Sequence, residues 1–351
     1  MKKIVILIPS LKKGGAEKQA CLLARALRDS HDVKMIIISP EAGMEEENIQ
    51  LSTLPLNSIH RLHGSVFLKA KNIYSILHTH RSDILFCYLT KPDILGPIVG
   101  KIAGVKYIYQ GLRNTRIPKA KMILEKIGNI FSTGAVINNY SGVDYFKQFN
   151  INNQIVIPNC FYNIQPERQR QEKKYITVVT VGRFVEQKDY PTAIAAMAEA
   201  MSKNPRLRYK IIGHGELECE VRDFVTKHGI SDKTEILINP KGIIKHLEDT
   251  DIYLATSLFE GTSNSIMEAL DASLPVVATN VGDNYRMVKD GITGFLEETG
   301  DIQSISNHIL TLSASNKMRN EFGIAGNRLL RETYSFDAFK KQYLDLVEMS
   351  E

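Results

Sequence analysis

The chain has 351 residues, 43% hydrophobic and 24% charged, which excludes a disordered or low-complexity protein and favours two domains of roughly 100–200 residues each. Its four cysteines form no C-x-x-C pair. The apolar start MKKIVILIPS is too short for a signal peptide, and no apolar run has the length of a membrane span. We therefore expect a cytosolic protein with reduced thiols. The net charge of +5 is the sum of +10 in residues 1–160 and −5 in residues 161–351. This asymmetry suggests that the first half meets an anionic partner or surface. Scattered solubilising lysines would give the same charge.

Short apolar segments alternate with helix-like segments through the first half. The helical stretches include 16–29 and 92–104, and the predicted strands lie at 4–9, 33–39, 83–89, 107–112, 134–138 and 154–158. Near-continuous Val, Ile and Leu in strands separated by helices are typical of a parallel sheet that is covered on both faces. Residues 1–161 are therefore predicted to form a first α/β domain.

A polar segment, residues 162–174, interrupts this pattern and is the predicted interdomain linker. The alternation then resumes, with a helix at 190–204 and strands at 175–181, 209–213, 235–239, 251–257 and 274–280. The final stretch, 335–350, is amphipathic and begins with Ser and Asp, which is a helix-capping signal. The sequence thus predicts an α/β protein with two doubly wound, Rossmann-like domains, the second at 175–334, followed by a C-terminal helix in 335–351.

Ligands of open parallel sheets bind beyond the carboxyl ends of the strands, so the residues that follow each strand are the candidate site residues. Gly14 and Gly15 follow the first strand, where they allow close backbone approach and precede a helix N-terminus that suits a phosphate. The pattern is neither G-x-G-x-x-G nor a Walker loop, and a tight turn without any ligand would use the same two glycines.

Two cations follow the strand at 175–181. Arg183 leaves the strand directly, and Lys188 precedes a helix that Pro191 can open at its first turn. Cations placed where a strand meets a helix suit a diphosphate, whereas the alternative is two solvated surface charges. His214 lies in the glycine turn IIGHGEL after the next strand, where a loop residue is more usual than a catalyst.

The segment SLFEGTSNSIMEAL, residues 257–270, places Glu260 just after the strand at 251–257 and Glu268 inside the helix that follows. Ser265 and Glu268 have the S-x-x-E spacing of a capping box, which would explain Glu268 without a ligand. That spacing does not explain Glu260, an acid beside two cations and a helix N-terminus.

Two further motifs lie at the wrong end of a strand for this chemistry. The D-x-D motif of Asp249 and Asp251 precedes the strand at 251–257, and His78 and His80 precede the strand at 83–89. We therefore expect no metal at the D-x-D motif and surface positions for both histidines.

Taken together, these motifs resemble the retaining family-4 glycosyltransferases of GT-B architecture. The resemblance is specific from about residue 181 to residue 296, and the matching segments are VGRFVEQKDY, IIGHGE, DGITGFL and EGTSNSIMEALDASLPVVATNVGDN, which holds the E-x7-E pattern of Glu260 and Glu268. GGAEKQ near the start and IPN at 157–159 also match. The resemblance implies two Rossmann-like domains that face each other across a cleft, with the C-terminal helix crossing back to the first.

For function, the resemblance implies a retaining transferase of hexosyl or N-acetylhexosaminyl groups that uses a nucleotide diphosphate sugar, expected to be a UDP-sugar. Glu260 would bind hydroxyl groups of the transferred sugar and Glu268 those of the ribose, while Arg183 and Lys188 would stabilise charge on the departing diphosphate. No metal or other cofactor is expected, because the two cations and a helix N-terminus replace it. The other residues expected on the donor side are Gly14, Gly15, Gly182, His214, Ser263, Asn264, Ser265 and Ile266.

The chain departs from the family where many relatives carry a histidine near the sugar, because neither FCYLTKPD (86–93) nor YQGLRNTR (109–116) contains one. Arg113 in the second segment and Lys18 in GGAEKQ are the candidate acceptor-side residues. This departure affects the handling of the sugar and leaves the expected reaction class unchanged.

Three alternatives stay open. A GT-B-type UDP-sugar epimerase or hydrolase would need further acid/base groups near the sugar, and the strand ends supply none that we can nominate. A nicotinamide-dependent oxidoreductase would show G-x-G-x-x-G after the first strand and an acid about 20 residues later, whereas the chain has SLKKGGAE there and its second strand ends in Ser39. A binding module would tolerate loss of Glu260, Arg183 and Lys188, yet all three are present.

The segment RIPKAKMILEKIGNIF, residues 116–131, mixes four cations with an apolar stripe at Ile123, Ile127 and Ile130/Phe131. A basic amphipathic helix of this kind can lie on an anionic membrane surface. The plain alternative is that the stripe packs on the sheet and the lysines face water. We expect a cytoplasmic enzyme, peripheral at the inner face of the cell membrane, that extends a polyprenyl-diphosphate-linked glycan for a surface polysaccharide and binds no nucleic acid.

Overall fold

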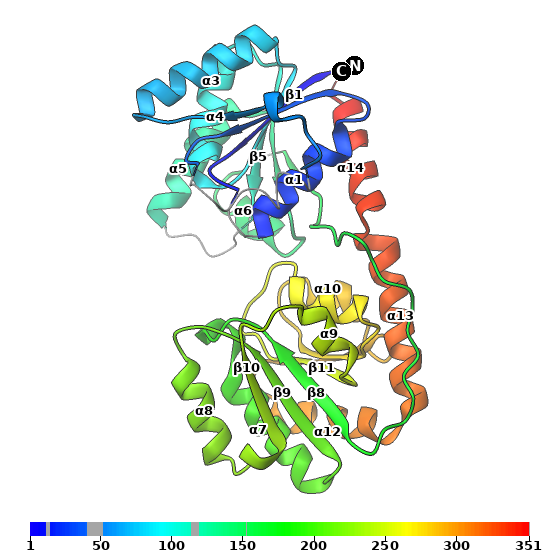
Figure 1. Cartoon of the computed structure of the whole chain (residues 1–351). Helices are drawn as coiled ribbons and strands as arrows, with labels where there is room; N and C mark the ends of the chain where they lie inside the picture. Colours follow the sequence, from blue (N-terminus) through cyan, green and yellow to red (C-terminus); the bar gives the residue numbers. More distant parts are fainter. Residues whose placement is uncertain (12–14, 41–51, 114–118, 152, 351) are drawn as a thin grey trace. The chain divides into compact units, whose positions relative to one another are not determined.

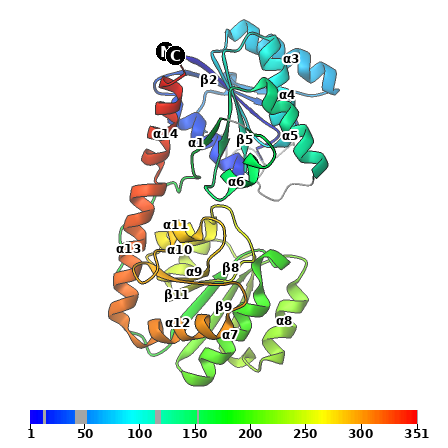
Figure 2. The same ribbon diagram turned by 180° about the vertical axis from the view of Figure 1, so that it is seen from behind.

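The computed structural model describes residues 1–11, 15–40, 52–113, 119–151 and 153–350, without the side chains of 119 and 120. The chain divides into two compact units (Figures 1 and 2). Unit 1 comprises Met1–Cys160 with Phe336–Glu351, and unit 2 comprises Phe161–Ser335. Among the described residues, no helix combines the length and the apolar character that a membrane span requires.

Unit 1 is built on a seven-stranded sheet in which every neighbouring pair of strands is parallel, in the order β3-β2-β1-β4-β5-β6-β7. The central strands are buried on both faces, which explains their near-continuous Val, Ile and Leu. The strands are β1 (Lys3–Ile8), β2 (Asp32–Ile37), β3 (Ile59–Arg61), β4 (Ile84–Cys87), β5 (Tyr107–Leu112), β6 (Gly134–Ile137) and β7 (Gln154–Val156).

Helices cover both faces of this sheet. Three of them lie on one face: α3 (Val66–His80), α4 (Thr90–Ile102) and α5 (Lys119–Phe131) (Figures 1 and 2). Each of these helices connects two strands in the same direction along the sheet, and right-handed crossovers that run in one direction place their helices on the same face. The other face carries α1 (Gly15–Leu27) and the C-terminal helix α14 (Phe336–Glu348), which pack on each other. The described residues of the unit also form two short helices, η1 (Leu56–Ser58) and α6 (Gly142–Lys147).

The C-terminal helix α14 and the residues just after it are anchored in unit 1 by polar contacts. The hydroxyl groups of Tyr343 and Tyr88 lie 3.2 Å apart, and those of Ser350 and Tyr109 lie 2.8 Å apart. Lys2 donates a hydrogen bond from Nζ to the carbonyl oxygen of Val347 at 2.9 Å.

One histidine expected at the surface is buried instead. His80 holds its Nε2 atom 3.0 Å from Asp32 Oδ2 and its Nδ1 atom 3.1 Å from Ser82 Oγ. Burial lowers the pKa of His80, while the hydrogen bond to Asp32 acts in the opposite direction. His78 is exposed, as expected, and its ring stacks on that of Tyr74.

Unit 2 is a second doubly wound domain, with six parallel strands in the order β10-β9-β8-β11-β12-β13. The prediction of two doubly wound domains is therefore confirmed. The strands are β8 (Ile176–Val181), β9 (Leu207–Gly213), β10 (Thr234–Ile238), β11 (Ile252–Ala255), β12 (Val276–Thr279) and β13 (Gly294–Glu297).

Two hydrophobic cores lie on the two faces of this sheet. One lies under α7 (Tyr190–Lys203) and α12 (Ile302–Ala314), and the other under α10 (Asn264–Asp271) and α13 (Asn316–Tyr334). The strand order reverses between β8 and β11, and this reversal is the point where doubly wound sheets bind ligands. The helices of unit 2 are η2 (Glu186–Lys188), α7 (Tyr190–Lys203), α8 (Glu218–Lys227), η3 (Ser231–Lys233), α9 (Ile243–Glu248), α10 (Asn264–Asp271), α11 (Asn284–Met287), α12 (Ile302–Ala314) and α13 (Asn316–Tyr334).

The segment 162–174 packs along unit 2. Arg170 is buried within it, and its guanidinium group donates hydrogen bonds to the carbonyl oxygens of Thr250 (2.8 Å), Ser273 (2.6 Å) and Ala272 (2.6 Å). Burial lowers the pKa of Arg170 to about 10, so the group stays charged at neutral pH. The chain enters and leaves unit 2 at one place, because the Phe161 amide donates to the carbonyl oxygen of Tyr334 at 2.7 Å.

Candidate functional site

Lys188 and Glu260 meet at the carboxyl ends of β8 and β11, where the strand order of unit 2 reverses. Lys188 Nζ lies 2.5 Å from Glu260 Oε1, and the two side chains are 16% and 10% exposed. Ser257 Oγ donates a second hydrogen bond to Glu260 Oε1 at 2.8 Å. The pair is thus an ion pair with little solvent access, held at the edge of the sheet where a ligand is expected.

Backbone contacts fix the two loops that carry this pair. The Leu258 amide donates to the carbonyl oxygen of Gln187 at 2.8 Å, and Gln187 Nε2 donates to the carbonyl oxygen of Phe259 at 2.8 Å. Thr256 Oγ1 donates to the carbonyl oxygen of Asp189 at 2.9 Å. Asp189 also caps α7 by accepting a hydrogen bond from the Thr192 amide at 3.4 Å, and Pro191 stands in the first turn, as predicted.

A glycine beneath Glu260 allows a third loop to approach the site. Gly282 has φ +57°, and a Cβ atom there would lie 2.2 Å from the carbonyl oxygen of Glu260. Only glycine combines this backbone conformation with such close contact. The Glu260 backbone is therefore enclosed between the loop after β8 and the loop after β12.

The helix that follows Glu260 begins at Asn264, and its first turn points to the same edge of the sheet. Its N-cap residue, Ser263, makes no side-chain capping bond, and the first intrahelical hydrogen bond joins the Met267 amide to the Ser263 carbonyl oxygen at 3.1 Å. The amides of Asn264, Ser265 and Ile266 precede that bond, so they are the ones that can donate to an anion.

The capping-box explanation of Glu268 is wrong. Ser265 lies inside the first turn of α10 and is not its N-cap, and its hydroxyl oxygen lies 3.2 Å from Ser263 Oγ. Glu268 is half-buried and lies one turn further along α10. Its position therefore has no capping role, and the ligand-binding interpretation from the sequence stays a prediction.

Arg183 and His214 border the site with their side chains exposed. The Arg183 guanidinium group has no hydrogen-bond or ion-pair partner within the part of the chain that the structure describes. The two loops are joined through the backbone, because the Phe184 amide donates to the His214 carbonyl oxygen at 2.8 Å. Gly182 lies between strand and loop, where its carbonyl oxygen accepts a hydrogen bond from Tyr190 Oη at 2.8 Å.

Tyr253 is a site residue that the sequence reasoning missed. It is buried in β11 beneath the ion pair and donates from Oη to the carbonyl oxygen of Val181 at 3.2 Å. Burial raises its pKa, a hydrogen bond with Ser265 acts in the opposite direction, and the charges of Glu268 and Glu260 raise it further. Its neutral hydroxyl group thus connects β8 to the start of α10. The only signal in the sequence is a tyrosine within a buried apolar strand.

The residues predicted on the acceptor side gather at the carboxyl edge of the unit 1 sheet. Arg113 follows β5, donates from Nη1 to Asn159 Oδ1 at 2.7 Å, and stacks over the Tyr88 ring at 4.4 Å. Burial raises the pKa of the Cys160 thiol to about 12, and the charges of Lys18 and Arg113 act in the opposite direction. Gly15 begins α1 at the same edge, and Gly14 lies outside the described residues.

The D-x-D motif lies at the opposite edge of the unit 2 sheet, as predicted. Asp251 is buried just before β11, where its Oδ2 atom accepts a hydrogen bond from the Thr177 amide at 2.8 Å and its Oδ1 atom lies 3.5 Å from Lys173 Nζ. Its role is to join the starts of two strands. Within the described residues, no group of three or more His, Cys, Asp or Glu side chains is arranged to hold a metal ion.

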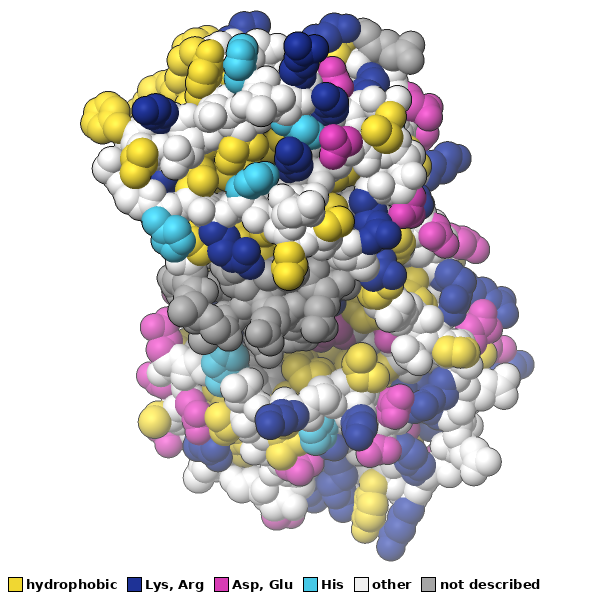
Figure 3. Space-filling view, turned by 45° about the horizontal axis from the view of Figure 1, so that its top comes forward, with side chains coloured by type: hydrophobic (Ala, Val, Ile, Leu, Met, Phe, Trp, Pro, Cys, Tyr) yellow, Lys and Arg dark blue, Asp and Glu magenta, His cyan; other side chains and the backbone are white. Residues whose placement is uncertain are grey.

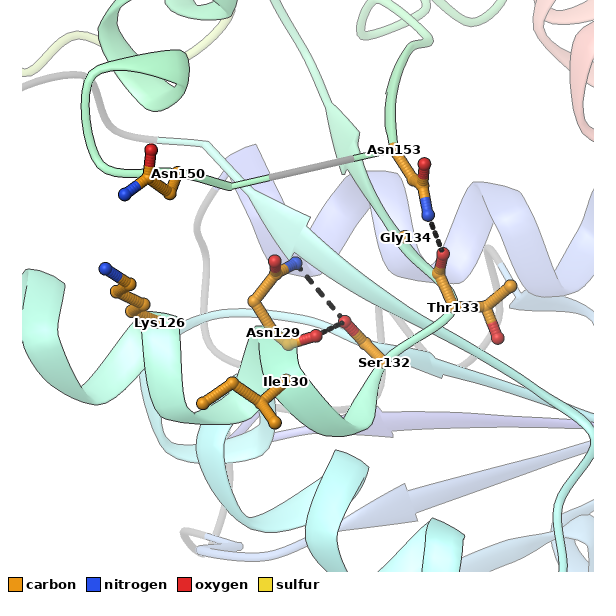
Figure 4. A pocket seen from close by; sticks show the side chains of 8 residues that line it. All are labelled: Lys126, Asn129, Ile130, Ser132, Thr133, Gly134, Asn150 and Asn153. Atoms are coloured by element: carbon orange, nitrogen blue, oxygen red, sulfur yellow. Dashed lines mark hydrogen bonds between the residues drawn. The ribbon is translucent and has the colours of Figure 1, made fainter.

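A polar cavity of about 420 Å³ in unit 1 is separate from these candidate residues (Figure 4). Lys126, Asn129 and Ile130 reach it from α5, and Asn150 and Asn153 from the segment before β7. The cavity lies at the amino ends of β6 and β7, whereas the candidate acceptor residues lie at the carboxyl ends.

One family model matches part of the chain. Residues 162–329, nearly all of unit 2, match the family model described as "Glycosyl transferases group 1". The match concerns unit 2, and Arg183, Lys188, Glu260 and Glu268 all lie within the matched range.

Two curated relatives show how far the similarity extends. The UDP-Gal:alpha-D-GlcNAc-diphosphoundecaprenol alpha-1,3-galactosyltransferase of Escherichia coli is 24% identical over 314 residues, which cover 79% of each chain. The phosphatidylinositol N-acetylglucosaminyltransferase gpi3 subunit of Schizosaccharomyces pombe is 26% identical over 175 residues. Here the match covers 47% of this chain and only 38% of the relative, so the chain spans less than half the length of that protein.

A solved structure with a similar fold is that of Anabaena Alr3699/HepE in complex with UDP. It has a TM-score of 0.84 and 18% identity, with 99% of this chain and 100% of the other covered. This likeness shows the fold, which consists of two Rossmann-like domains, as the sequence predicted.

Proposed function

We propose that the chain is a retaining glycosyltransferase that moves a hexosyl or N-acetylhexosaminyl group from a UDP-sugar to a glycan acceptor. The observation that carries this proposal is the Lys188–Glu260 ion pair beside the first turn of α10, at the edge where β8 and β11 end. The family match of residues 162–329 and the relatives that transfer galactose or N-acetylglucosamine support the same reaction class.

The geometry of unit 2 suits a departing diphosphate. Lys188, Arg183 and the amides at the start of α10 all favour negative charge and all follow strands at the same edge of the sheet, and Arg183 has no competing partner among the described residues. Such fixed cations and dipoles stabilise charge that develops on a leaving group. For this reason we propose that the reaction needs no divalent metal ion.

Glu260 is held so that one of its oxygens stays available. Its Oε1 atom accepts hydrogen bonds from both Lys188 and Ser257, whereas its Oε2 atom has no hydrogen-bond partner in the described residues. An ionised carboxylate accepts hydrogen bonds at both oxygens, so Oε2 is suited to bind sugar hydroxyl groups. Glu268, one turn further along α10, would bind the ribose.

The acceptor is proposed to be a polyprenyl-diphosphate-linked glycan, extended at the cytoplasmic face of the membrane for a surface polysaccharide. The Escherichia coli relative, whose name includes a diphosphoundecaprenol acceptor, supports this class of substrate. Arg113 and Lys18, which both follow strands at the carboxyl edge of the unit 1 sheet, offer two cations to such a diphosphate.

One experiment separates this function from its rivals. Purified chain is mixed with UDP-sugars that carry different sugars, with and without a polyprenyl-diphosphate-linked acceptor, and release of UDP is measured in chelator and in manganese. We expect acceptor-dependent release that the chelator leaves unchanged, and NMR of the product should show the anomeric configuration of the donor. UDP or an altered sugar formed equally without acceptor would favour a hydrolase or an epimerase. An inverted product, or activity restored only by manganese, would refute the mechanism.

A further inference from the structure

Helix α5 turns its apolar stripe away from the core of unit 1. Ile123 is 61% exposed and Ile130 is 72% exposed, and Leu124, Ile127 and Phe131 between and beside them are exposed as well. These positions recur at the spacing of one helical face. The alternative that the stripe packs on the sheet is therefore wrong.

The inward face of α5 carries Met122, which packs in a hydrophobic core of unit 1, and beside it polar and small residues. Glu125 is 1% exposed, and the buried side chain of Gln110 donates from Nε2 to the carbonyl oxygens of Asp93 (2.9 Å) and Glu125 (3.0 Å). Gly128 brings α5 close to α4, because a Cβ atom there would lie 2.2 Å from the carbonyl oxygen of Asp93. A rotation of α5 that buried the stripe would break these contacts and expose Gln110. The contacts of the inward face therefore hold the apolar stripe on the outer surface of the helix.

The helices beside α5 present lysines without any exposed acid. In α3, α4 and α5 the only carboxylates are Asp93 and Glu125, and both are buried. None of the six lysines with described side chains on these helices is buried, and none forms an ion pair with the described residues; they are Lys69, Lys71, Lys91, Lys101, Lys121 and Lys126.

More apolar side chains are exposed on the same three helices. Ile102 at the end of α4 is exposed, as are Val66, Phe67 and Leu68 at the start of α3. Figure 3 shows hydrophobic and basic side chains next to each other at the upper left, over the part of unit 1 that α3 forms, with few acidic side chains among them. The face combines exposed apolar groups with charge of one sign.

We propose that the outer surface of α5, supported by the lysines of α3 and α4, docks on a lipid bilayer with anionic headgroups. The isoleucines enter the boundary between headgroups and acyl chains, and the lysines contact the headgroups. Charge selects this occupant, because a second copy would bring the same uncompensated lysines against each other. The inference rests on the proposed function, since it places the enzyme where a polyprenyl-linked acceptor lies, but its test needs no turnover.

The test is co-sedimentation of the full chain with vesicles. Vesicles of equal parts phosphatidylglycerol and phosphatidylcholine are compared with pure phosphatidylcholine, at low salt and at high salt. The main variant is Ile127→Glu/Ile130→Glu, and a second is Lys121→Gln/Lys126→Gln. Ile292→Glu is the matched control, because Ile292 is an apolar residue of unit 2 with 60% exposure, similar to Ile123.

We expect the wild type and Ile292→Glu to bind the anionic vesicles in a salt-sensitive manner. The isoleucine variant should bind at least tenfold more weakly, and the lysine variant should lose most of its preference for anionic lipid. Thermal shift with UDP measures the donor site separately, so a chain that binds lipid but not UDP would refute the proposed function and leave this inference standing.

Three results would overturn the inference. One is that the wild type stays in the supernatant at low salt, and another is that both variants bind as tightly as the wild type. The third is a concentration-dependent dimer, detected by sedimentation velocity without lipid, that Ile127→Glu/Ile130→Glu abolishes, because a second copy would then be the occupant of this surface.

Discussion

Replacement of Glu125 by glutamine should make the stability of the protein less sensitive to a rise in pH from about 4.5 to about 7. Burial raises the pKa of Glu125 from 4.5 to about 7, against the opposing effects of the hydrogen bond from Thr90 and the charge of Lys121. The folded chain therefore holds a proton that the unfolded chain releases, so stability falls as pH rises from 4.5 to about 7 and then stays level.

The size of this effect follows from the two pKa values. One pKa unit corresponds to about 1.4 kcal/mol, so the full loss is roughly 3 kcal/mol, of which roughly 2 kcal/mol falls between pH 5.5 and pH 8. Glu125→Gln removes the titrating group, so its free energy of unfolding relative to wild type should rise by that amount over this interval. Asp93, whose pKa is raised by burial and by the charge of Glu125, should then ionise more readily.

Urea unfolding of wild type and Glu125→Gln at several pH values, followed by circular dichroism, measures this difference. The two units can unfold in separate transitions, so the comparison is made on the transition that the variant shifts. Asp144→Asn is the control, because Asp144 lies in the same unit with its side chain 91% exposed. Parallel pH profiles for wild type and Glu125→Gln would show that Glu125 ionises normally in the folded state and would refute the reasoning.

The remaining predictions concern the candidate site in unit 2. Glu260→Gln and Arg183→Ala should each lower turnover by about two orders of magnitude, as loss of one charge-stabilising group commonly does. The control variant Lys227→Ala, at an exposed position, should keep its turnover. A normal rate for Arg183→Ala would show that Arg183 is a solvated surface charge. Glu268→Gln should chiefly weaken UDP binding, measured by titration calorimetry, and an unchanged affinity with a lower rate would contradict its assignment to the ribose. Gly282→Ala should lower turnover about tenfold or more by displacing Glu260, while a normal rate with only a lower melting temperature would show that the loop adapts.

The sequence predicted every central strand of the two sheets and two of the four edge strands, β7 and β10. Runs such as residues 107–112 are strands because they are buried on both faces, and burial leaves a continuous apolar pattern. β3 and β13 were missed, since edge strands of three and four residues carry little pattern. The 19-residue helix α13 was also missed, because Gly323 interrupts it as a breaker would; in the structure this glycine allows contact with the Ser273 carbonyl oxygen.

Residues of the site could be predicted one by one, but not their contacts. Strand ends and helix starts pointed to Arg183, Lys188 and Glu260, because doubly wound sheets bind ligands there. The ion pair itself depends on hydrogen bonds between loops 72 residues apart in sequence, such as that from Gln187 to Phe259. His80 was misplaced for the same reason, because its partner Asp32 is 48 residues away.

The orientation of α5 was left open by its sequence, because an apolar stripe is compatible with either face of the helix. The decision came from residues outside the stripe. Gln110 on β5 and the close approach of Gly128 to α4 favour a polar inward face, and both depend on tertiary packing.

The hydrogen bond between Phe161 and Tyr334 has a consequence for how the gene for such a protein can change. It joins the first residue of unit 2 to its last but one, so the two ends of this continuous stretch lie next to each other. A segment with adjacent ends can be exchanged without altering the spacing of the residues on either side. Recombination at residues 160 and 336 would therefore replace all of unit 2, the proposed donor side, and keep unit 1, the proposed acceptor side, which offers a route to new donor and acceptor combinations.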